Sequence, residues 1–463
     1  MILTILGGGG FRVPLVYQAI LKDTSDERVT ELRLYDIDES RLQTIYRVLI
    51  ELNETADYHP RIVATTDLVE AIAGADFIFS AIRVGGTQGR ALDEVISLKH
   101  GVIGQETVGA GGISYALRGI PEVVAIALQV KKHAPNAWVI NFTNPAGIMS
   151  EVMQRYIPGR VVGICDSPVG LARRILTALQ RAQLLPQDLS TNVPGNKRVH
   201  VEYAGLNHLG WITKLLVDGQ DVIPVLLQRP DLIESFEEGR LFGANLVQSL
   251  GSVPNEYLHY YYYPRENLQT DQKSDHTRGR YLEEQQNRFY TQAESTETGV
   301  FDLWERTRLE REQTYMATNR EATGNFERDT QDLESGGYDK IALAIMHAIA
   351  NDVPAELILN VANQGVIKEL DDSAVVEIPC RVDGRGIHLP ETAYLPDHAR
   401  GLVVNAKYVE RETILAALDH SRSDAILALA HHPLVDSFNV ATQLLDDLVA
   451  HFEALQPLGK HDV

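Results

Sequence analysis

The chain has 463 residues, of which 44% are hydrophobic and 23% are charged. This composition predicts a folded globular protein with a large core, and it excludes collagen-like, low-complexity and disordered chains. The formal net charge of −21 argues against a nucleic-acid partner, because an acidic surface repels a phosphate backbone.

The cysteine content and the apolar runs indicate the compartment. Cys165 and Cys380 are the two cysteines, too few and too far apart for a disulfide framework. No run approaches the roughly 18 consecutive apolar residues of a membrane span. The first residues also lack the basic segment of an export signal. We therefore expect a cytoplasmic protein with no membrane partner.

Apolar runs alternate with helical patterns through the first half of the chain. Strands are expected at residues 1–6, 31–35, 77–81, 138–141 and 161–164. Helices are expected after Pro14 and at residues 40–52, 120–132 and 145–155. This alternation predicts an α/β fold of the Rossmann type, with a doubly wound parallel sheet covered on both faces.

The pattern changes after about residue 195. Strands are expected at residues 199–203, 210–217 and 375–381, and helices at 338–352 and 412–429. Residues 285–319 predict a solvated helix because they are rich in charge, and the polar tail from residue 455 is expected to fray. We predict a Rossmann-type domain over residues 1–195 and a C-terminal mixed α+β domain over residues 196–463, packed together without a flexible linker.

Four glycines follow the first predicted strand. Gly7–Gly10 stand where a dinucleotide-binding turn belongs, because glycine lets backbone N–H groups approach a pyrophosphate. A merely tight turn is equally compatible, since Arg12 occupies the third glycine place of the strict pattern. Asp36 ends the second strand, where a carboxylate accepts both ribose hydroxyls and repels a 2′-phosphate. Asp36 therefore favours NAD over NADP.

Three further residues are candidates for catalysis or metal binding. Cys165 follows the strand at 161–164, and His208 lies among apolar residues. A thiolate and an imidazole suit a divalent metal with open positions, although a packed thiol and a core histidine are the simpler interpretation. Tyr257 is the first of five tyrosines within seven residues. Most of these tyrosines should pack, and one could act as a base beside a cation.

Charged residues at several places are candidates for binding an anionic substrate. Guanidinium groups match phosphate geometry, but each candidate taken alone could equally be a surface residue or an ion-pair partner. The cationic candidates are Arg83, Arg90, His276, Arg278 and Arg280. Glu106 lies in a glycine-rich stretch, residues 104–112, which either wraps a ligand or simply turns tightly.

Read together, these segments resemble glycoside hydrolase family 4, the glycosidases that depend on NAD and a divalent metal and often act on 6-phosphoglucosides. Nine short motifs in one order, spread over nearly the whole chain, carry the resemblance. They are residues 7–10, 83–85, 104–107, 144–146, 165–168, 205–208, 256–258, 276–278 and 376–380.

The resemblance implies a role for each matching residue. Tyr257 matches the base that removes the proton from sugar carbon 2, and Asp166 matches the general acid of the 6-phospho-α-glucosidase branch. Cys165 and His208 match the metal ligands, and we expect Mn²⁺. The cofactor site comprises Gly7, Gly8, Gly9, Gly10, Phe11, Arg12 and Asp36. The substrate site comprises Arg83, Arg90, Glu106, Asn144, Asn207 and Arg278.

The resemblance also implies a reaction without the usual pair of carboxylates. NAD⁺ takes a hydride from sugar carbon 3, the metal polarises the resulting ketone, and Tyr257 removes the carbon 2 proton. The aglycone then leaves by elimination, water adds, and the hydride returns. The expected substrate is a phosphorylated disaccharide or glucoside, and the expected assembly is a homo-oligomer, either a dimer or a tetramer.

Two segments depart from the family pattern, the glycine turn and the turn at Asp166. Phe11 and Arg12 stand where many members carry Ser or Thr, and Asp166 stands where the 6-phospho-β-glucosidase branch has Asn. On overall similarity we favour a 6-phospho-β-glucosidase. The alternatives are a 6-phospho-α-glucosidase or an α-galactosidase-type member of the family, an NAD-dependent hydroxyacid dehydrogenase, and a noncatalytic regulator that binds NAD or a sugar phosphate.

Overall fold

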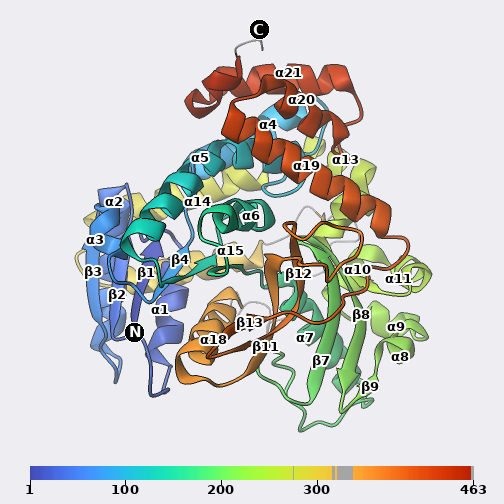
Figure 1. Ribbon diagram of the computed structural model, residues 1–463, viewed down its shortest axis with the longest axis horizontal. Helices are drawn as coiled ribbons and strands as arrows, with labels where there is room; N and C mark the ends of the chain where they lie inside the picture. Colours follow the sequence, from blue (N-terminus) through green and yellow to red (C-terminus); the bar gives the residue numbers. More distant parts are fainter. Residues whose placement is uncertain (275, 315–318, 321–336, 460–463) are drawn as a thin grey trace.

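A parallel sheet forms the N-terminal half of the molecule (Figure 1). The computed structural model describes residues 1–274, 276–314, 319–320 and 337–459. The parallel strands are β1 (Ile2–Leu6), β2 (Glu31–Tyr35), β3 (Arg61–Thr65), β4 (Phe77–Ser80), β5 (Trp138–Asn141) and β6 (Val161–Gly163). Their order, β3-β2-β1-β4-β5-β6, is that of a doubly wound Rossmann fold, which confirms the predicted fold class.

Helices connect these strands and cover both faces of the sheet. They are α1 (Val13–Leu21), α2 (Glu39–Glu54), α3 (Leu68–Ile72), α4 (Gly86–Lys99), α5 (Ala110–His133), α6 (Ala146–Tyr156) and α7 (Ser167–Arg181). Helix α5 begins ten residues before the predicted start at residue 120. Its first turn is rich in glycine because a Cβ on Gly111 would lie 2.3 Å from the carbonyl oxygen of Gly104. Those glycines therefore serve close packing and do not break the helix.

The sheet continues into the second half of the chain with antiparallel strands. β11 (Ala355–Ala362), which the sequence analysis missed, pairs with β6 at Asn360 and Gly163. Beyond it lie β12 (Val375–Asp383), β7 (Val199–Leu206), β8 (Leu209–Val217) and β10 (Val253–Pro254), with β13 (Gly386–His388) and β9 (Gln220–Asp221) beside β12 and β8. The two halves thus share one sheet of 13 strands.

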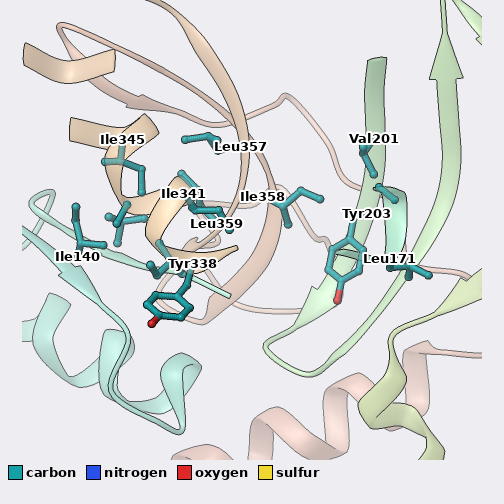
Figure 2. Packing of buried hydrophobic residues seen from close by; sticks show 14 of the residues in the cluster. Ile140, Leu171, Val201, Tyr203, Tyr338, Ile341, Ile345, Leu357, Ile358 and Leu359 are labelled. Atoms are coloured by element: carbon teal, nitrogen blue, oxygen red, sulfur yellow. The ribbon is translucent and has the colours of Figure 1, made fainter. Parts of the chain in front are cut away.

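Strand β11 lies at the centre of the core that joins the two halves. Figure 2 shows Leu357, Ile358 and Leu359 of β11 in one cluster with residues of helix α18 (Tyr338–Asn351) and strand β7. Tyr203 and Tyr338 belong to this cluster and are almost fully buried. Burial of these apolar side chains therefore stabilises the packing of the two halves against each other.

Short helices surround the antiparallel strands. They are α8 (Ile223–Leu227), α9 (Pro230–Ile233), α10 (Glu237–Phe242), α11 (Ala244–Leu250), η1 (Glu256–Leu258), α12 (His259–Tyr262) and α13 (Pro264–Lys273). The run of tyrosines falls on η1 and α12. Tyr257 alone of that run follows a cap in which the Asn255 side chain accepts from its backbone N–H at 3.1 Å.

The charge-rich segment forms two helices, α14 (Arg278–Ser295) and α15 (Val300–Gln313). The prediction of one solvated helix over residues 285–319 was wrong, because Phe289 and Trp304 are buried against the N-terminal half. Gly299, with a φ of +81°, caps α15 and separates the two helices. Of the predicted span, residues 315–318 lie outside the described part of the chain.

The C-terminal helices return to the N-terminal half, where they pack beside α4 and α5 (Figure 1). They are α19 (Arg400–Asp419), α20 (Arg422–His431), α21 (Phe438–His451) and η2 (Glu453–Gly459). The helix predicted at 412–429 is broken at His420, whose φ is +54°. Leu455 and Leu458 of η2 are buried, so residues 455–459 do not fray as predicted, and residues 460–463 lie outside the described part. The domain boundary at residue 195 stays a prediction.

Helix α5 has the length and apolar character of a membrane-crossing helix by composition alone. In this fold 67% of its most apolar stretch is buried inside the protein, between the sheet and the C-terminal helices. Its composition is therefore accounted for by its place in the core.

A buried ion pair joins α4 to α5. Asp93 accepts from Arg118 at 2.8 and 2.6 Å, and the Arg118 guanidinium lies 3.9 Å from the centroid of the Phe452 ring. We expect Asp93→Asn to lower the free energy of unfolding by about 3 to 5 kcal/mol, because it leaves a buried guanidinium without its counter-charge. Urea denaturation followed by circular dichroism measures this change.

The matched control is Asp231→Asn, which breaks the exposed pair between Asp231 and Arg229. It should leave the unfolding midpoint unchanged, because water screens an exposed pair. Equal midpoints for the Asp93 variant and the wild-type chain would contradict the importance of the buried pair.

Candidate active site

A cavity of about 810 Å³ opens at the carboxyl ends of β5 and β6. Ligands of open α/β sheets bind at this edge. All the residues that the family resemblance assigns to catalysis, metal binding and substrate binding line it: Arg83, Arg90, Glu106, Asn144, Cys165, Asp166, Asn207, His208, Tyr257 and Arg278. His276 lines it too, whereas Arg280 is exposed on α14 and does not.

Cys165 and Asp166 stand between β6 and α7. The Cys165 thiol is buried and forms no disulfide. Burial, together with the carboxylates of Glu377 and Asp166, raises the pKa of Cys165 well above its usual value. Burial also raises the pKa of Asp166 to about 6, although Arg12 opposes the shift. Asp166 can therefore hold a proton near neutrality, which suits a general acid.

His208 occupies the turn between β7 and β8 with a φ of +62°. Its Nδ1 lies 2.7 Å from Oγ1 of Thr107, and its ring stacks on Tyr257 with centroids 3.6 Å apart and an angle of 9°. Burial lowers the pKa of His208 to about 3, so the imidazole is neutral. The predicted ligand and the predicted base are thus in direct contact.

Glu106 draws two of the predicted substrate residues together. Its carboxylate accepts from Arg83 and from Arg90, the latter at 2.5 Å, and Arg90 also bonds Glu94 at 3.0 Å. Burial alone would raise the pKa of Glu106, but Arg83 and Arg90 hold it below its usual value. Arg83 and Arg90 are therefore already partly neutralised within the protein.

Three other guanidinium groups gather where the glycine turn meets the cavity. Arg278 of α14 donates to Oγ1 of Thr314 at 2.6 Å and to the carbonyl of Arg311 at 3.1 Å. Burial and the neighbouring Arg12 and Arg278 lower the pKa of Arg311 to about 9. Within the described residues the Arg311 side chain has no hydrogen bond or ion pair. An anionic ligand group would relieve this concentration of positive charge. The sequence analysis missed Arg311 because no motif sets it apart within a charge-rich helix.

The glycine turn borders a second cavity of about 160 Å³, which shares Arg12, Asn144 and Arg311 with the larger one. Of the predicted cofactor residues, Gly7, Gly10, Phe11 and Arg12 line this cavity, whereas Gly8, Gly9 and Asp36 are not among its lining residues. A Cβ on Gly7 would lie 2.6 Å from the carbonyl oxygen of Ala81, so the turn needs glycine there. The turn therefore leaves room at the start of α1 for a pyrophosphate, as a bound dinucleotide requires.

Asp36 supports this turn. Its Oδ2 accepts from the backbone N–H of Gly9 at 2.9 Å, and its Oδ1 accepts from Asp38 at 3.0 Å. Each carboxylate oxygen keeps a further lone pair for a ribose hydroxyl. Asp38, not Asp36, caps α2, so the Asp36 carboxylate is not used as a helix cap.

Aromatic residues from the second half hold the glycine turn in place. The Tyr290 hydroxyl donates to the Gly9 carbonyl at 2.6 Å, and the Trp304 indole N–H donates to the Phe11 carbonyl at 2.7 Å. The Phe11 ring packs edge-on against Phe289 with centroids 5.3 Å apart. The Phe11 ring therefore packs against α14 and its carbonyl holds α15, which accounts for an apolar residue directly after the glycine turn.

The donor set around Cys165 and His208 fits a divalent metal with open positions. The described residues contain no group of three or more His, Cys, Asp or Glu side chains arranged to hold a metal. Cys165 and His208 would thus supply two ligands, and a sugar's oxygens or water would complete the shell. A thiolate and an imidazole suit a borderline cation.

Glu377 of β12 lies close to Cys165 and Asn207; the sequence analysis included it in the motif at residues 376–380 but gave it no role. Burial raises the pKa of Glu377 to about 7. Its carboxylate accepts from Asn360 at 2.9 Å, Tyr203 at 3.1 Å and Asn207 at 3.2 Å. Glu377 therefore positions Asn207, the neighbour of His208 in the turn.

Comparisons with known proteins agree with this arrangement. The chain is 31% identical to maltose-6′-phosphate glucosidase of Bacillus subtilis (strain 168), over 96% of this chain and 94% of the relative. It is also 31% identical to a probable 6-phospho-beta-glucosidase of the same organism, over 98% and 96%. A solved structure of the 6-phospho-beta glucosidase from Thermotoga maritima with manganese, NAD⁺ and glucose-6-phosphate superposes with a TM-score of 0.79 at 26% identity, covering 98% of each chain.

Family matches cover most of the sequence. Residues 2–181 match Family 4 glycosyl hydrolase, and residues 203–435 match the Family 4 glycosyl hydrolase C-terminal domain. The resemblance seen in the sequence is thereby confirmed, and the chain belongs to glycosyl hydrolase family 4.

Proposed function

We propose that this protein hydrolyses 6-phosphoglucosides with NAD and Mn²⁺, and that its substrate is a 6-phospho-β-glucoside. One observation carries the proposal: a single cavity gathers the thiol, the imidazole, the phenol and the raised-pKa carboxyl, and it adjoins the glycine turn. The relatives are phosphoglucosidases by name, and the solved neighbour binds NAD⁺ and manganese.

Each reactive side chain has a role in this proposal. Bound NAD⁺ and Mn²⁺ would supply a hydride acceptor and a Lewis acid. Tyr257 takes the proton from sugar carbon 2, and its stacking on His208 holds its hydroxyl at a fixed place in the cavity. Asp166 gives a proton to the departing oxygen, as its raised pKa permits.

The cationic wall of the cavity supports a phosphorylated substrate. Arg278 and Arg311 lie side by side on the wall, and Arg12 is near them. Guanidinium groups bind phosphate in a bidentate manner. We assign the 6-phosphate to this wall, in the part of the cavity that Asn144 also lines.

The alternatives differ in their support. A 6-phospho-α-glucosidase remains the second candidate, because Asp166 matches that branch and the maltose-6′-phosphate relative is as similar as the β relative. A hydroxyacid dehydrogenase is disfavoured, because family 4 matches extend through the C-terminal half. We keep the predictions of a cytoplasmic location and of a dimer or tetramer.

One assay tests the function. The 4-nitrophenyl 6-phosphoglucosides of both anomers are compared with unphosphorylated and 6-phosphogalactoside controls, each with and without NAD and Mn²⁺. We expect nitrophenol release from the phosphorylated β anomer only when both additions are present. Release without NAD would contradict the proposal, and stoichiometric NADH formed from a 2-hydroxy acid would favour the dehydrogenase.

Asp36 should govern NAD affinity. Because hydrogen bonds to a charged group are worth roughly 1.5 to 3 kcal/mol, we expect Asp36→Asn to raise the Kd for NAD by about 10- to 100-fold. It should also reduce the preference for NAD over NADP, since the charge that repels a 2′-phosphate is gone. Isothermal titration calorimetry with both dinucleotides measures this.

The control is Asp38→Asn, two residues away. Asn caps a helix as well as Asp does, so α2 stays capped and NAD affinity should not change. An unchanged Kd in the Asp36 variant would remove Asp36 from the cofactor site.

A further inference from the structure

The loop before α5 contacts the candidate metal ligand through a chain of hydrogen bonds. Oε1 of Gln105 accepts from the backbone N–H groups of Thr107 at 2.7 Å and Val108 at 2.9 Å. The same oxygen accepts from the Thr107 hydroxyl at 3.0 Å. Thr107 Oγ1 in turn lies 2.7 Å from Nδ1 of His208. The chain therefore runs from Gln105 through Thr107 to the imidazole.

The direction of the bond between Thr107 and His208 depends on where the single Thr107 hydroxyl proton lies. Two backbone N–H groups point at one terminal atom of the Gln105 side chain, so that atom is the amide oxygen and not the nitrogen. A hydroxyl has one proton, and in the arrangement proposed below Thr107 gives it to Oε1 of Gln105, an atom that can only accept. Thr107 Oγ1 can then only accept from His208, so Nδ1 carries the imidazole proton.

This arrangement leaves the other ring nitrogen as a base. With the proton on Nδ1, Nε2 of the neutral ring has a free lone pair. Nε2 makes no hydrogen bond within the described residues, and His208 lines the large cavity with Cys165. The stacked Tyr257 ring restrains the imidazole face while Thr107 restrains its edge. The ring is therefore fixed in tautomer and in orientation.

We propose that Gln105 and Thr107 are positioning residues that fix the Nδ1–H tautomer and the plane of His208, so that Nε2 is presented to a divalent cation. This inference rests on the proposed metal site at Cys165 and His208. Partners of this kind orient metal-bound histidines in proteins and strengthen them as ligands. Through the ring stacking, the same two residues set the position of Tyr257.

The first test is Mn²⁺ affinity, measured by calorimetry or by the electron paramagnetic resonance signal of free Mn²⁺. Thr107→Val keeps the shape of the side chain and removes the hydroxyl, and we expect Mn²⁺ to bind about 10- to 100-fold more weakly. Thr107→Ser restores the hydroxyl and should bind within about threefold of the wild-type chain. The control is Thr213→Val on β8, whose hydroxyl bonds the Glu202 carbonyl outside the cavity.

A double variant tests whether Gln105 and Thr107 act on His208 through one connected series of hydrogen bonds. Gln105→Leu should also weaken Mn²⁺ binding, because the Thr107 proton loses its acceptor. The double variant Gln105→Leu/Thr107→Val should be little weaker than Thr107→Val alone, since both changes break the same connection to His208. If the losses of Mn²⁺ affinity in the two single variants add fully in the double variant, the two residues do not act through one series of hydrogen bonds, and the inference is overturned.

The tautomer can be read in the unmodified protein, which covers the case in which a variant fails to fold. In metal-free protein labelled with ¹⁵N-histidine, NMR should show His208 protonated at Nδ1 and not at Nε2, with the signal assigned by its loss in His208→Gln. A proton on Nε2 would overturn the inference. Equal Mn²⁺ affinity of the folded Thr107→Val variant and the wild-type chain would also overturn it.

Failure of the metal site itself gives a different result. If His208→Ala and Cys165→Ser bind Mn²⁺ as tightly as the wild-type chain, the proposed site is wrong whatever Thr107 does. If those two variants lose Mn²⁺ and Thr107→Val retains it, the site stands and the positioning role falls.

Discussion

We expect Tyr257→Phe to lower kcat by about 100- to 10,000-fold, because a general base contributes that much to a reaction. The change removes one oxygen and keeps the ring that stacks on His208, so Mn²⁺ and NAD affinities should stay within about twofold. Turnover of a 4-nitrophenyl 6-phosphoglucoside and calorimetry with NAD measure the two effects separately.

The matched control comes from the same run of tyrosines. Tyr263 does not line the cavity, and its hydroxyl donates to the Phe242 carbonyl at 2.6 Å. Tyr263→Phe should leave kcat within about twofold of the wild-type value. Normal turnover in Tyr257→Phe would remove Tyr257 from the role of base, and equal losses in both variants would indicate a structural effect.

The second large effect concerns the metal. Replacing Cys165 by serine exchanges a soft thiolate ligand for a hydroxyl, so we expect Mn²⁺ affinity to fall by more than about 100-fold. This loss exceeds the one usually seen when a residue that only hydrogen-bonds a metal ligand is replaced. Turnover should fall with it, whereas NAD affinity should not change, because Cys165 does not line the cavity beside the glycine turn. Calorimetry with Mn²⁺ and with NAD tests both statements.

The other cysteine provides the comparison. Cys380 is buried in β12, does not line the cavity and bonds the Ile378 carbonyl at 3.6 Å, so Cys380→Ala should keep Mn²⁺ affinity. In the wild-type chain, a chelator should abolish turnover and added Mn²⁺ should restore it. Full turnover in excess chelator would refute the metal dependence.

Much of the site was predictable because its residues follow strands whose apolar runs are plain in the sequence. Cys165 and Asn144 each come just after such a run, and parallel strands bring their carboxyl ends to one edge. The motif order then allowed the resemblance to be recognised. The local sequence therefore predicted both the Rossmann topology and the candidate site residues that line the cavity.

Other features depend on contacts between distant segments. β11 has only three consecutive apolar residues, 357–359, before Asn360 interrupts the run, so its pattern does not separate a strand from a helix. The burial of α15 depends on Trp304 reaching the carbonyl of Phe11 nearly three hundred residues earlier. Arg311 becomes notable only when Arg12 and Arg278 lie beside it. Such features arise from tertiary packing, which residue patterns do not encode locally.

The antiparallel junction of β11 with β6 bears on how a substrate reaches the cavity. Many two-lobed enzymes open and close by a hinge rotation of one lobe against the other. Here the two halves are joined by strand pairing and share one core, so such a rotation would break backbone hydrogen bonds and separate packed side chains. Entry and exit of sugars must therefore involve movement of loops and helices at the mouth, while the strands stay in register.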